Sequence, residues 1–233
     1  MARPRNDVQR EATRTQILDT ARNQMALYGT AGIGMRAIAR ELDLTPAAIY
    51  RYFPSLDDII TELIAGAFNS LADALEAARD NAAADDPVAQ LRSVMVTYRA
   101  WAIAHPTDFQ LIYGNPIPGY HAPREITVPA VVRGFTVIVG QFEAALQSGA
   151  LRPRRPYDRI PADTDAYIRE LIAREGYPVV PLAMYLGMVA WSAGHGIVTL
   201  ELFEHLQSVI GDPAVFYAAQ IDALLYAFGA APG

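Results

Sequence analysis

Residues 35–53 contain two short helical patterns with only a few residues between them, and this stretch limits the fold more than any other. In the first pattern apolar residues recur at i, i+3, i+4 and i+7, at Met35, Ile38, Ala39 and Leu42. Gly34 is the expected N-cap of this helix, and Asp43 occupies the sharp turn after it. Thr45 followed by Pro46 is a strong start signal for the second helix. Because isolated helices this short are marginally stable in water, tertiary packing must hold the pair at a fixed angle.

The rest of the chain also has helical periodicity, and no strand-like alternation or fixed-period repeat stands out. We predict further helices over 11–28, 56–80, 87–105, 108–114, 128–149, 164–175, 181–207 and 212–228. The Pro- and Gly-rich segment 114–125 and the Pro- and Arg-rich segment 151–163 are expected to be mainly loops. The predicted fold class is therefore all-α. An N-terminal three-helix domain spans 1–56, and a long connector helix joins it to a helical body within 57–233.

Charge is distributed unevenly along the 233 residues. The net charge of −6 argues at first against a nucleic-acid partner, but residues 1–56 carry eight Arg and five acidic residues. The chain contains no Cys, which excludes disulfides, thiolate zinc sites and cysteine nucleophiles. Its polar start has no apolar stretch of the signal-peptide type, so we expect a cytoplasmic protein.

Two helices joined by a turn of three or four residues form a helix-turn-helix, whose second helix enters the DNA major groove. Ile49 and Phe53 are spaced to hold this helix on a core of Ile17, Ile38 and Leu42. The opposite side then presents Pro46, Ala47, Tyr50 and Arg51. Because any small helical protein can contain such a turn, the geometry alone leaves DNA binding open.

Three segments carry a resemblance to a known family. They are Ile17-Leu18 through Tyr28-Gly29, Ile38-Ala39-Arg40-Glu41-Leu42, and Ala48-Ile49-Tyr50-Arg51-Tyr52-Phe53-Pro54-Ser55. Together they resemble the N-terminal domain of TetR-family transcriptional regulators over about residues 11–65. The resemblance implies double-stranded operator DNA as the partner of this domain.

By that resemblance, bases would be contacted by Arg36, Pro46, Ala47, Ala48 and Arg51. The sugar-phosphate backbone would be held by Thr45, Tyr50 and Tyr52. The sequence departs from the family pattern where Asp43 replaces a Gly and where Leu56 replaces a phosphate-binding Lys. A flexible basic arm would compensate through Arg3, Arg5, Arg10 and Arg14, unless that arm is only a solvated tail.

One such domain buries too little surface for specific binding, so the motif usually acts as a homodimer on a two-fold site. Small residues recur every three or four positions in helix 181–207, at Ala183, Gly187, Ala190, Gly194 and Ile197. A similar stripe in helix 212–228 comprises Phe216, Ala219, Gln220, Ala223 and Ala227. We expect these stripes to form a four-helix dimer contact, as the resemblance also implies.

A second face of helix 181–207 carries Met184, Met188, Trp191 and His195. Trp191 to Gly196 is similar to the Trp-x-x-x-His-Gly signature of one TetR C-terminal subgroup, and His105-Pro106 with Phe109 fits the same subgroup. Further aromatic surface comes from Tyr98, Trp101, Phe109 and Tyr113, with Phe135 and Phe142 as additional candidates. These residues are expected to line a cavity for an apolar or aromatic effector. The alternative is that they are ordinary core residues and that His195 is structural.

The resemblance implies a regulator, commonly a repressor, whose effector shifts the dimer away from the DNA-competent arrangement. Other classes have less support. The sequence lacks G-x-S-x-G, H-E-x-x-H and a phosphate-binding Gly-rich loop, so no enzyme, metal site or cofactor is predicted. Residues 182–202 are apolar enough for a membrane span, but the segment is Gly-rich and contains His195 and Glu201. A DNA-binding architectural protein without a sensor function also stays open.

Overall fold

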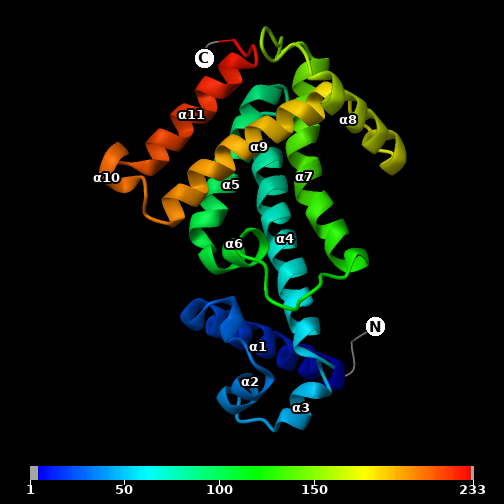
Figure 1. Cartoon of the computed structure of the whole chain (residues 1–233), viewed down its shortest axis with the longest axis vertical. Coiled ribbons are helices and arrows are strands. Elements are labelled where there is room, and N and C mark those ends of the chain that lie inside the picture. The colour runs from blue at the N-terminus through cyan, green and yellow to red at the C-terminus, as the bar shows by residue number, and fades with distance from the viewer. Residues whose placement is uncertain (1–4, 232–233) are drawn as a thin grey trace. The chain divides into compact units, whose positions relative to one another are not determined.

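A computed structural model describes residues 5–231, and its regular structure is helical throughout apart from one isolated bridge between Leu151 and Ala230. The all-α prediction is confirmed. A 3₁₀ turn, Thr30–Gly32, follows the first helix. The α-helices, labelled in Figure 1, are α1 (Arg5–Tyr28), α2 (Met35–Glu41), α3 (Pro46–Tyr50), α4 (Leu56–Asn81), α5 (Pro87–Ala104), α6 (Pro106–Tyr113), α7 (Arg124–Gln147), α8 (Ala162–Glu175), α9 (Pro181–Leu202), α10 (Gln207–Ile210) and α11 (Pro213–Ala227).

Two helix ends differ from the sequence prediction by five residues or more. Helix α1 begins at Arg5 rather than near residue 11, so the prediction of a flexible arm is wrong for Arg10 and Arg14. Arg5 also starts this helix, but its side chain lies outside the described residues, as does all of Arg3. Helix α9 ends at Leu202, five residues before the predicted end, and Glu204 then takes a φ of 60°. A positive φ cannot continue a right-handed helix, so the short α10 forms separately.

The chain divides into two compact units. The first comprises the chain up to Asn69 together with His105–Val131, and the second comprises Ser70–Ala104 together with the chain from Val132 onward. Helices α4 and α7 each contribute residues to both units. The first unit therefore contains α6 and the loop after it, which the sequence boundary at residue 56 does not include.

The core of the first unit holds the helix-turn-helix together. Ile17, Ile38, Ile49 and Phe53 are all buried in it, and Leu42 packs against it from the edge. This is the packing predicted for the second helix of the motif. Leu111 and three partly buried residues from the later segment, Ile112, Ile117 and Tyr120, complete the same core. Tyr120 also hydrogen bonds to Thr61 on α4, with 2.9 Å between the two hydroxyl oxygens.

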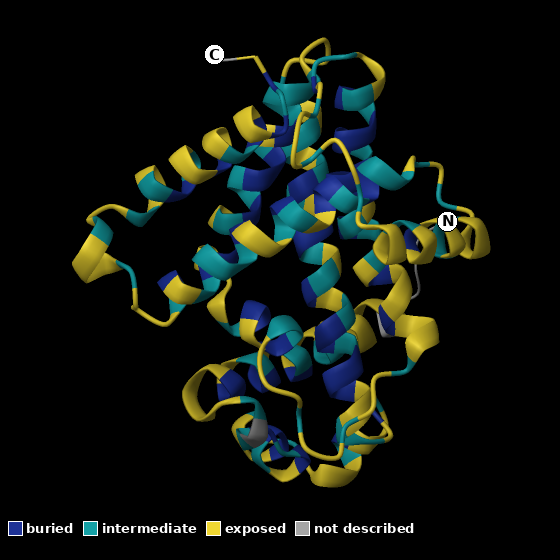
Figure 2. Cartoon of the chain, turned by 45° about the horizontal axis from the view of Figure 1, so that its top comes forward, coloured by how far each residue is buried: buried dark blue, intermediate teal, exposed yellow. Residues whose placement is uncertain are grey.

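In the second unit α5, α9 and α11 pack against one another. Each of these helices carries both buried and exposed residues, which Figure 2 colours dark blue and yellow. The hydroxyl of buried Tyr217 on α11 donates to the carbonyl of Met95 on α5 at 2.9 Å. Gly194 on α9 permits this contact, because a Cβ there would lie 2.8 Å from the Tyr217 hydroxyl oxygen. Burial raises the pKa of Tyr217, so its hydroxyl keeps its proton at neutral pH.

Helices α7 and α9 are long and apolar enough to cross a membrane by length and composition alone. The core helix of a soluble protein passes the same test. In this structure α9 packs against α5, α8 and α11, and 39% of its apolar window is buried inside the protein.

Candidate nucleic-acid interface and ligand site

The turn between α2 and α3 follows the local sequence signals. The Thr45 side-chain oxygen accepts a hydrogen bond from the Ala48 backbone N–H at 3.2 Å, and Pro46 is the first helical residue. Asp43 adopts a φ of 52°, the left-handed conformation expected at the turn. Gly34 is the N-cap of α2, as predicted. The start of α3 is therefore fixed by a side-chain cap and by the restricted backbone of proline.

The predicted DNA contacts lie together in the first unit, on the side of the motif away from its core. Arg36, Thr45, Pro46, Ala47, Tyr50 and Arg51 are exposed, and Ala48 and Tyr52 are partly exposed. Tyr50 keeps 52% of its surface accessible even though the neighbouring Ile49 is fully buried. Helix α3 thus separates a core face from a free face, as a helix that enters a groove requires. The contacts with DNA stay a prediction.

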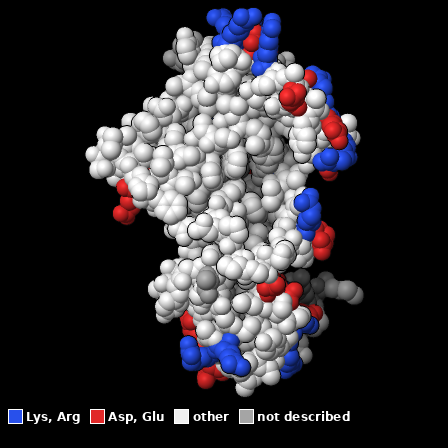
Figure 3. All heavy atoms as spheres, in the orientation of Figure 1, with Lys and Arg blue, Asp and Glu red and all other residues white. Residues whose placement is uncertain are grey.

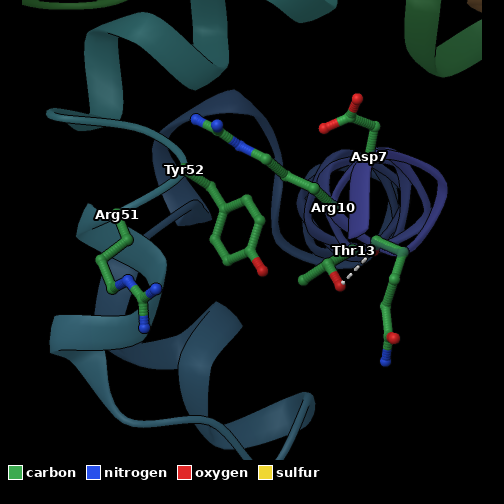
Figure 4. Close-up of a pocket in the computed structure, with 6 residues that line it drawn as sticks. Asp7, Arg10, Thr13, Arg51 and Tyr52 are labelled. Carbon is green, nitrogen blue, oxygen red and sulfur yellow. Dashed lines mark hydrogen bonds between the residues drawn. The ribbon is translucent and has the colours of Figure 1, made fainter. Parts of the chain in front are cut away.

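A cavity of about 710 Å³ lies between the N-terminal part of α1 and the residues after α3. Its lining is mostly polar and consists of Asp7, Gln9, Arg10, Thr13, Arg51 and Tyr52. In Figure 4 the Tyr52 hydroxyl and the Thr13 side chain point into the same space from opposite sides. The Thr13 hydroxyl also donates to the Gln9 carbonyl at 3.0 Å. Sequence reasoning missed Gln9 and Thr13, although their spacing of four places them on one helical face.

Arg14 has a different role from the predicted arm contact. Its guanidinium donates to the Tyr52 backbone carbonyl at 3.0 Å, forms an ion pair with Glu62, and lies 4.4 Å above the centre of the Phe53 ring. All of these partners lie in the first unit. Arg14 therefore positions the residues that follow α3 while its charge is neutralised internally.

The departure at Leu56 also has a structural reason. Leu56 starts α4, and its uncharged side chain packs against the core of the first unit instead of offering a cation to DNA. Beside it, the Ser55 hydroxyl accepts a hydrogen bond from the Asp58 backbone N–H at 3.2 Å. The Asp58 carboxylate accepts one in return from the Ser55 backbone N–H at 2.8 Å. This reciprocal pair is a capping box, and it fixes where α4 begins.

Three of the predicted ligand residues lie together in the second unit. The Tyr98 hydroxyl is 2.7 Å from Nδ1 of His195, and the Trp191 ring centre lies 5.0 Å from that of His195. Tyr98 is buried, whereas His195 and Trp191 are partly exposed. Burial lowers the pKa of His195 below its ordinary value of 6.5, so the imidazole is neutral at pH 7. The cluster offers aromatic surface with a neutral polar anchor.

The other predicted ligand residues are placed differently. Trp101 is buried in the second unit and donates from Nε1 to the Ser70 hydroxyl at 3.1 Å. Met188 is 40% exposed. Phe109 and Tyr113 belong to α6 in the first unit, where their ring centres lie 5.2 Å apart. An apolar hollow of about 30 Å³ lies between α7 and α9, with Phe135 and Met184 among its lining residues.

Four of the five residues in the predicted dimer stripe on α9 face the interior of the second unit, and the fifth, Ile197, is partly exposed. The four buried residues are Ala183, Gly187, Ala190 and Gly194. A Cβ at Gly187 would lie 3.1 Å from the Val139 side chain on α7, and one at Gly194 would meet Tyr217. Small residues permit a close helix contact, but the sequence cannot tell an internal partner from a second chain. The α11 residues remain available, because Gln220 and Ala223 are exposed and Phe216 is partly exposed.

Comparison with known families and proteins gives matches along most of the chain. The family described as "Bacterial regulatory proteins, tetR family" matches residues 17–63. The family described as "Tetracyclin repressor-like, C-terminal domain" matches residues 91–224. The chain is 31% identical to the HTH-type transcriptional regulator Rv1816 of Mycobacterium tuberculosis over 219 residues, which cover 93% of this chain and 92% of that protein.

Solved structures show the same fold. The chain superposes on the protein SCO4313 with a TM-score of 0.77 and 30% identity, covering 96% of this chain and 100% of that one. It also superposes on RolR, solved in complex with resorcinol, with a TM-score of 0.54 and 15% identity, covering 96% of this chain and 90% of that one. The relatives with named activities are regulators.

Proposed function

Since this chain belongs to the TetR family of bacterial transcriptional regulators, we propose that it acts as a homodimeric repressor, releasing a palindromic operator when a small apolar or aromatic effector binds. The observation that carries this proposal is the exposed face of α2 and α3 on a helix-turn-helix whose opposite face is fully packed. We further propose that the C-terminal half belongs to the Trp-x-x-x-His-Gly subgroup, on the evidence of Trp191 and His195. The protein would act in the cytoplasm.

On DNA, α3 would lie in the major groove with Pro46, Ala47 and Ala48 close to the base edges, since their small side chains permit close approach. Arg51 and Arg36 would supply guanidinium groups to bases or phosphates. The cavity between α1 and α3 would accept a backbone phosphate beside Arg10 and the Tyr52 hydroxyl. This arrangement gives α1 a part in DNA binding without a flexible arm.

Two substitutions on this face should separate affinity from sequence preference. Arg36→Ala should cost about 1–3 kcal/mol and relax the preference at one position in each half-site, because a base contact is lost. Tyr50→Ala should weaken binding to all sequences, by about 1.5–3 kcal/mol per lost hydrogen bond to a charged phosphate. Selection of bound DNA from a random pool, followed by titration of the selected operator at one salt concentration, measures both effects.

Matched controls lie in the second unit. Tyr167 on α8 is 63% exposed, so Tyr167→Ala removes a similar aromatic surface, and Arg169→Ala removes the same charge as Arg36→Ala. Both controls should bind DNA like the parent. If Arg36→Ala and Tyr50→Ala behave like these controls, the assignment of the DNA-facing side is incorrect.

The effector site is proposed at Tyr98, Trp191 and His195, where two rings and a neutral imidazole meet. RolR holds resorcinol, a small phenol, on the same fold, so phenolic and other aromatic compounds are the first to test. The effector would favour a dimer arrangement in which the two DNA-binding units no longer match the operator. Because α4 contributes residues to both units, it provides a continuous helical connection for this change.

A compound that releases the operator should change the fluorescence of Trp191, and Trp191→Phe should abolish that change while Trp101 remains. His195→Ala should raise the concentration needed for release by about tenfold, the effect of losing one polar anchor. His205→Ala is the control, since His205 is exposed on the segment after α9. Release with unchanged Trp191 fluorescence and parent-like His195→Ala would place the effector elsewhere. If no compound releases the DNA, a regulator or architectural protein without a sensor becomes the better assignment.

A further inference from the structure

The Pro- and Arg-rich loop after α7 forms one wall of an open cavity in the second unit, with a volume of about 690 Å³. Arg152, Arg154 and Arg155 line it from the loop, and Tyr226 lines it from α11. No carboxylate side chain is among the described lining residues. Figure 3 shows arginine atoms gathered at the top of the view, where this loop lies in Figure 1, with a few acidic atoms among them. The described lining of the cavity is therefore cationic in a chain whose net charge is −6.

The loop arginines differ from the others in the second unit. Six arginines of that unit form ion pairs, namely Arg79, Arg92, Arg99, Arg133, Arg169 and Arg174. Over residues 5–231, none of Arg152, Arg154 and Arg155 forms an ion pair with a carboxylate, and all three are exposed. The loop's one acidic residue, Asp158, does not line the cavity. Like charges that line one cavity repel one another, so an anion that enters the cavity would relieve that repulsion.

The backbone that carries these arginines is held by the C-terminal turn. Leu151 pairs with Ala230 in an antiparallel bridge, and the Arg152 backbone N–H donates to the Gly229 carbonyl at 3.3 Å. Gly229 has a φ of 89°, and a Cβ there would lie 2.0 Å from the Arg152 carbonyl oxygen, so only glycine fits. Side chains anchor the far end of the loop, because the Tyr157 ring packs edge-on against buried Phe228 at 4.7 Å. The arginines are thus presented from a fixed frame.

We propose that this cavity is a second ligand site, which binds a small phosphate-bearing molecule of nucleotide size. Arginine guanidinium groups match phosphate oxygens in geometry and charge, and their bidentate hydrogen bonds are among the strongest in proteins. The volume lies within the usual range for small-molecule sites. Tyr226 is 65% exposed and supplies an aromatic surface on which a nucleobase stacks. The site is separate from the Tyr98, Trp191 and His195 cluster and does not depend on the effector proposed there.

Calorimetric titration of the full-length protein with ATP and with inorganic triphosphate tests the site, at about 50 mM and about 300 mM salt. The double substitution Arg154→Ala/Arg155→Ala should lower the affinity for both anions by at least about tenfold, because two charge-assisted contacts are lost. Tyr226→Ala should lower the affinity for ATP and leave the affinity for triphosphate unchanged. The control is Arg169→Ala/Arg174→Ala, which removes two exposed arginines from α8 and the same net charge. It should bind both anions like the parent.

Several outcomes would overturn the proposal. Failure of both anions to bind the parent at the lower salt, or an equal loss in the α8 control, would show that there is no specific phosphate site. Unchanged ATP binding by Tyr226→Ala would show that no nucleobase stacks on Tyr226, and the ligand would then be a simple phosphate chain rather than a nucleotide. If Arg154→Ala/Arg155→Ala lowers the affinity for a random DNA duplex as much as the affinity for ATP, the loop is a nucleic-acid-binding surface instead. Titration of the same variant with the operator separates this site from the proposed regulator function. The variant should bind the operator with the affinity of the parent even when it no longer binds the two anions.

Discussion

An Ala223→Arg variant should bind the operator on the order of a thousandfold more weakly than the parent, the typical margin that separates specific from non-specific binding. Ala223 is exposed on α11, in the stripe that we propose as the dimer contact. A two-fold axis brings each substituted residue to the same self-complementary surface, where an unpaired buried charge is strongly unfavourable. A monomer reaches only one half-site. Sedimentation velocity should show the monomer, and operator titration should show the loss.

Ala166→Arg on α8 is the matched control, since Ala166 is also an exposed alanine within a helix. It adds the same charge away from the proposed contact and should leave both the dimer and the affinity unchanged. A dimeric Ala223→Arg protein with parent-like affinity would move the interface away from this part of α11.

Arg99→Ala should lower the free energy of unfolding by about 3–5 kcal/mol, the usual result of leaving a buried charge without its partner. Arg99 on α5 pairs with Glu201 on α9, and its Nε lies 2.7 Å from a carboxylate oxygen. The two side chains are only 16% and 8% exposed. Glu201 also anchors the chain after α9, where its backbone carbonyl accepts a hydrogen bond from the Gln207 side chain at 2.9 Å. Urea denaturation at a fixed protein concentration measures the change.

The chain supplies a control for this prediction in the pair Arg92 and Asp222, which also joins α5 to another helix. These side chains are 46% and 49% exposed. Their hydrogen bond lowers the pKa of Asp222, but exposed pairs contribute about 1 kcal/mol or less because water and salt screen them. Equal losses in Arg92→Ala and Arg99→Ala would mean that burial does not determine the strength of these bridges.

The sequence predicted the helix-turn-helix well because its signals are local. Thr45, Pro46 and Ser55 act on the few residues beside them, so caps and turns followed from residue type. The burial of Ile49 and Phe53 followed from helical spacing. These features did not depend on how distant segments pack.

The errors arose where two distant segments meet. Small residues around Gly187 indicate close packing, but the sequence does not identify the packed neighbour, which is Val139 on α7. The sequence does not reveal the ion pair of Arg14, because its partner Glu62 lies far along the chain. The pairing of Tyr98 with His195 joins residues on α5 and α9, and sequence spacing alone gives no contact between them.

The packing of α6 and its loop into the first unit has a consequence for recombining regulators. Leu111, Ile117 and Tyr120 cover apolar surface that belongs to the helix-turn-helix core, although they lie about sixty residues after the DNA-facing segment ends. A chimera that contains only the N-terminal residues would expose that apolar surface to solvent, and the protein would tend to aggregate. To exchange operator specificity between such proteins, residues 105–131 must therefore be transferred together with the helix-turn-helix. Otherwise the recipient protein needs a corresponding segment that covers the same apolar surface.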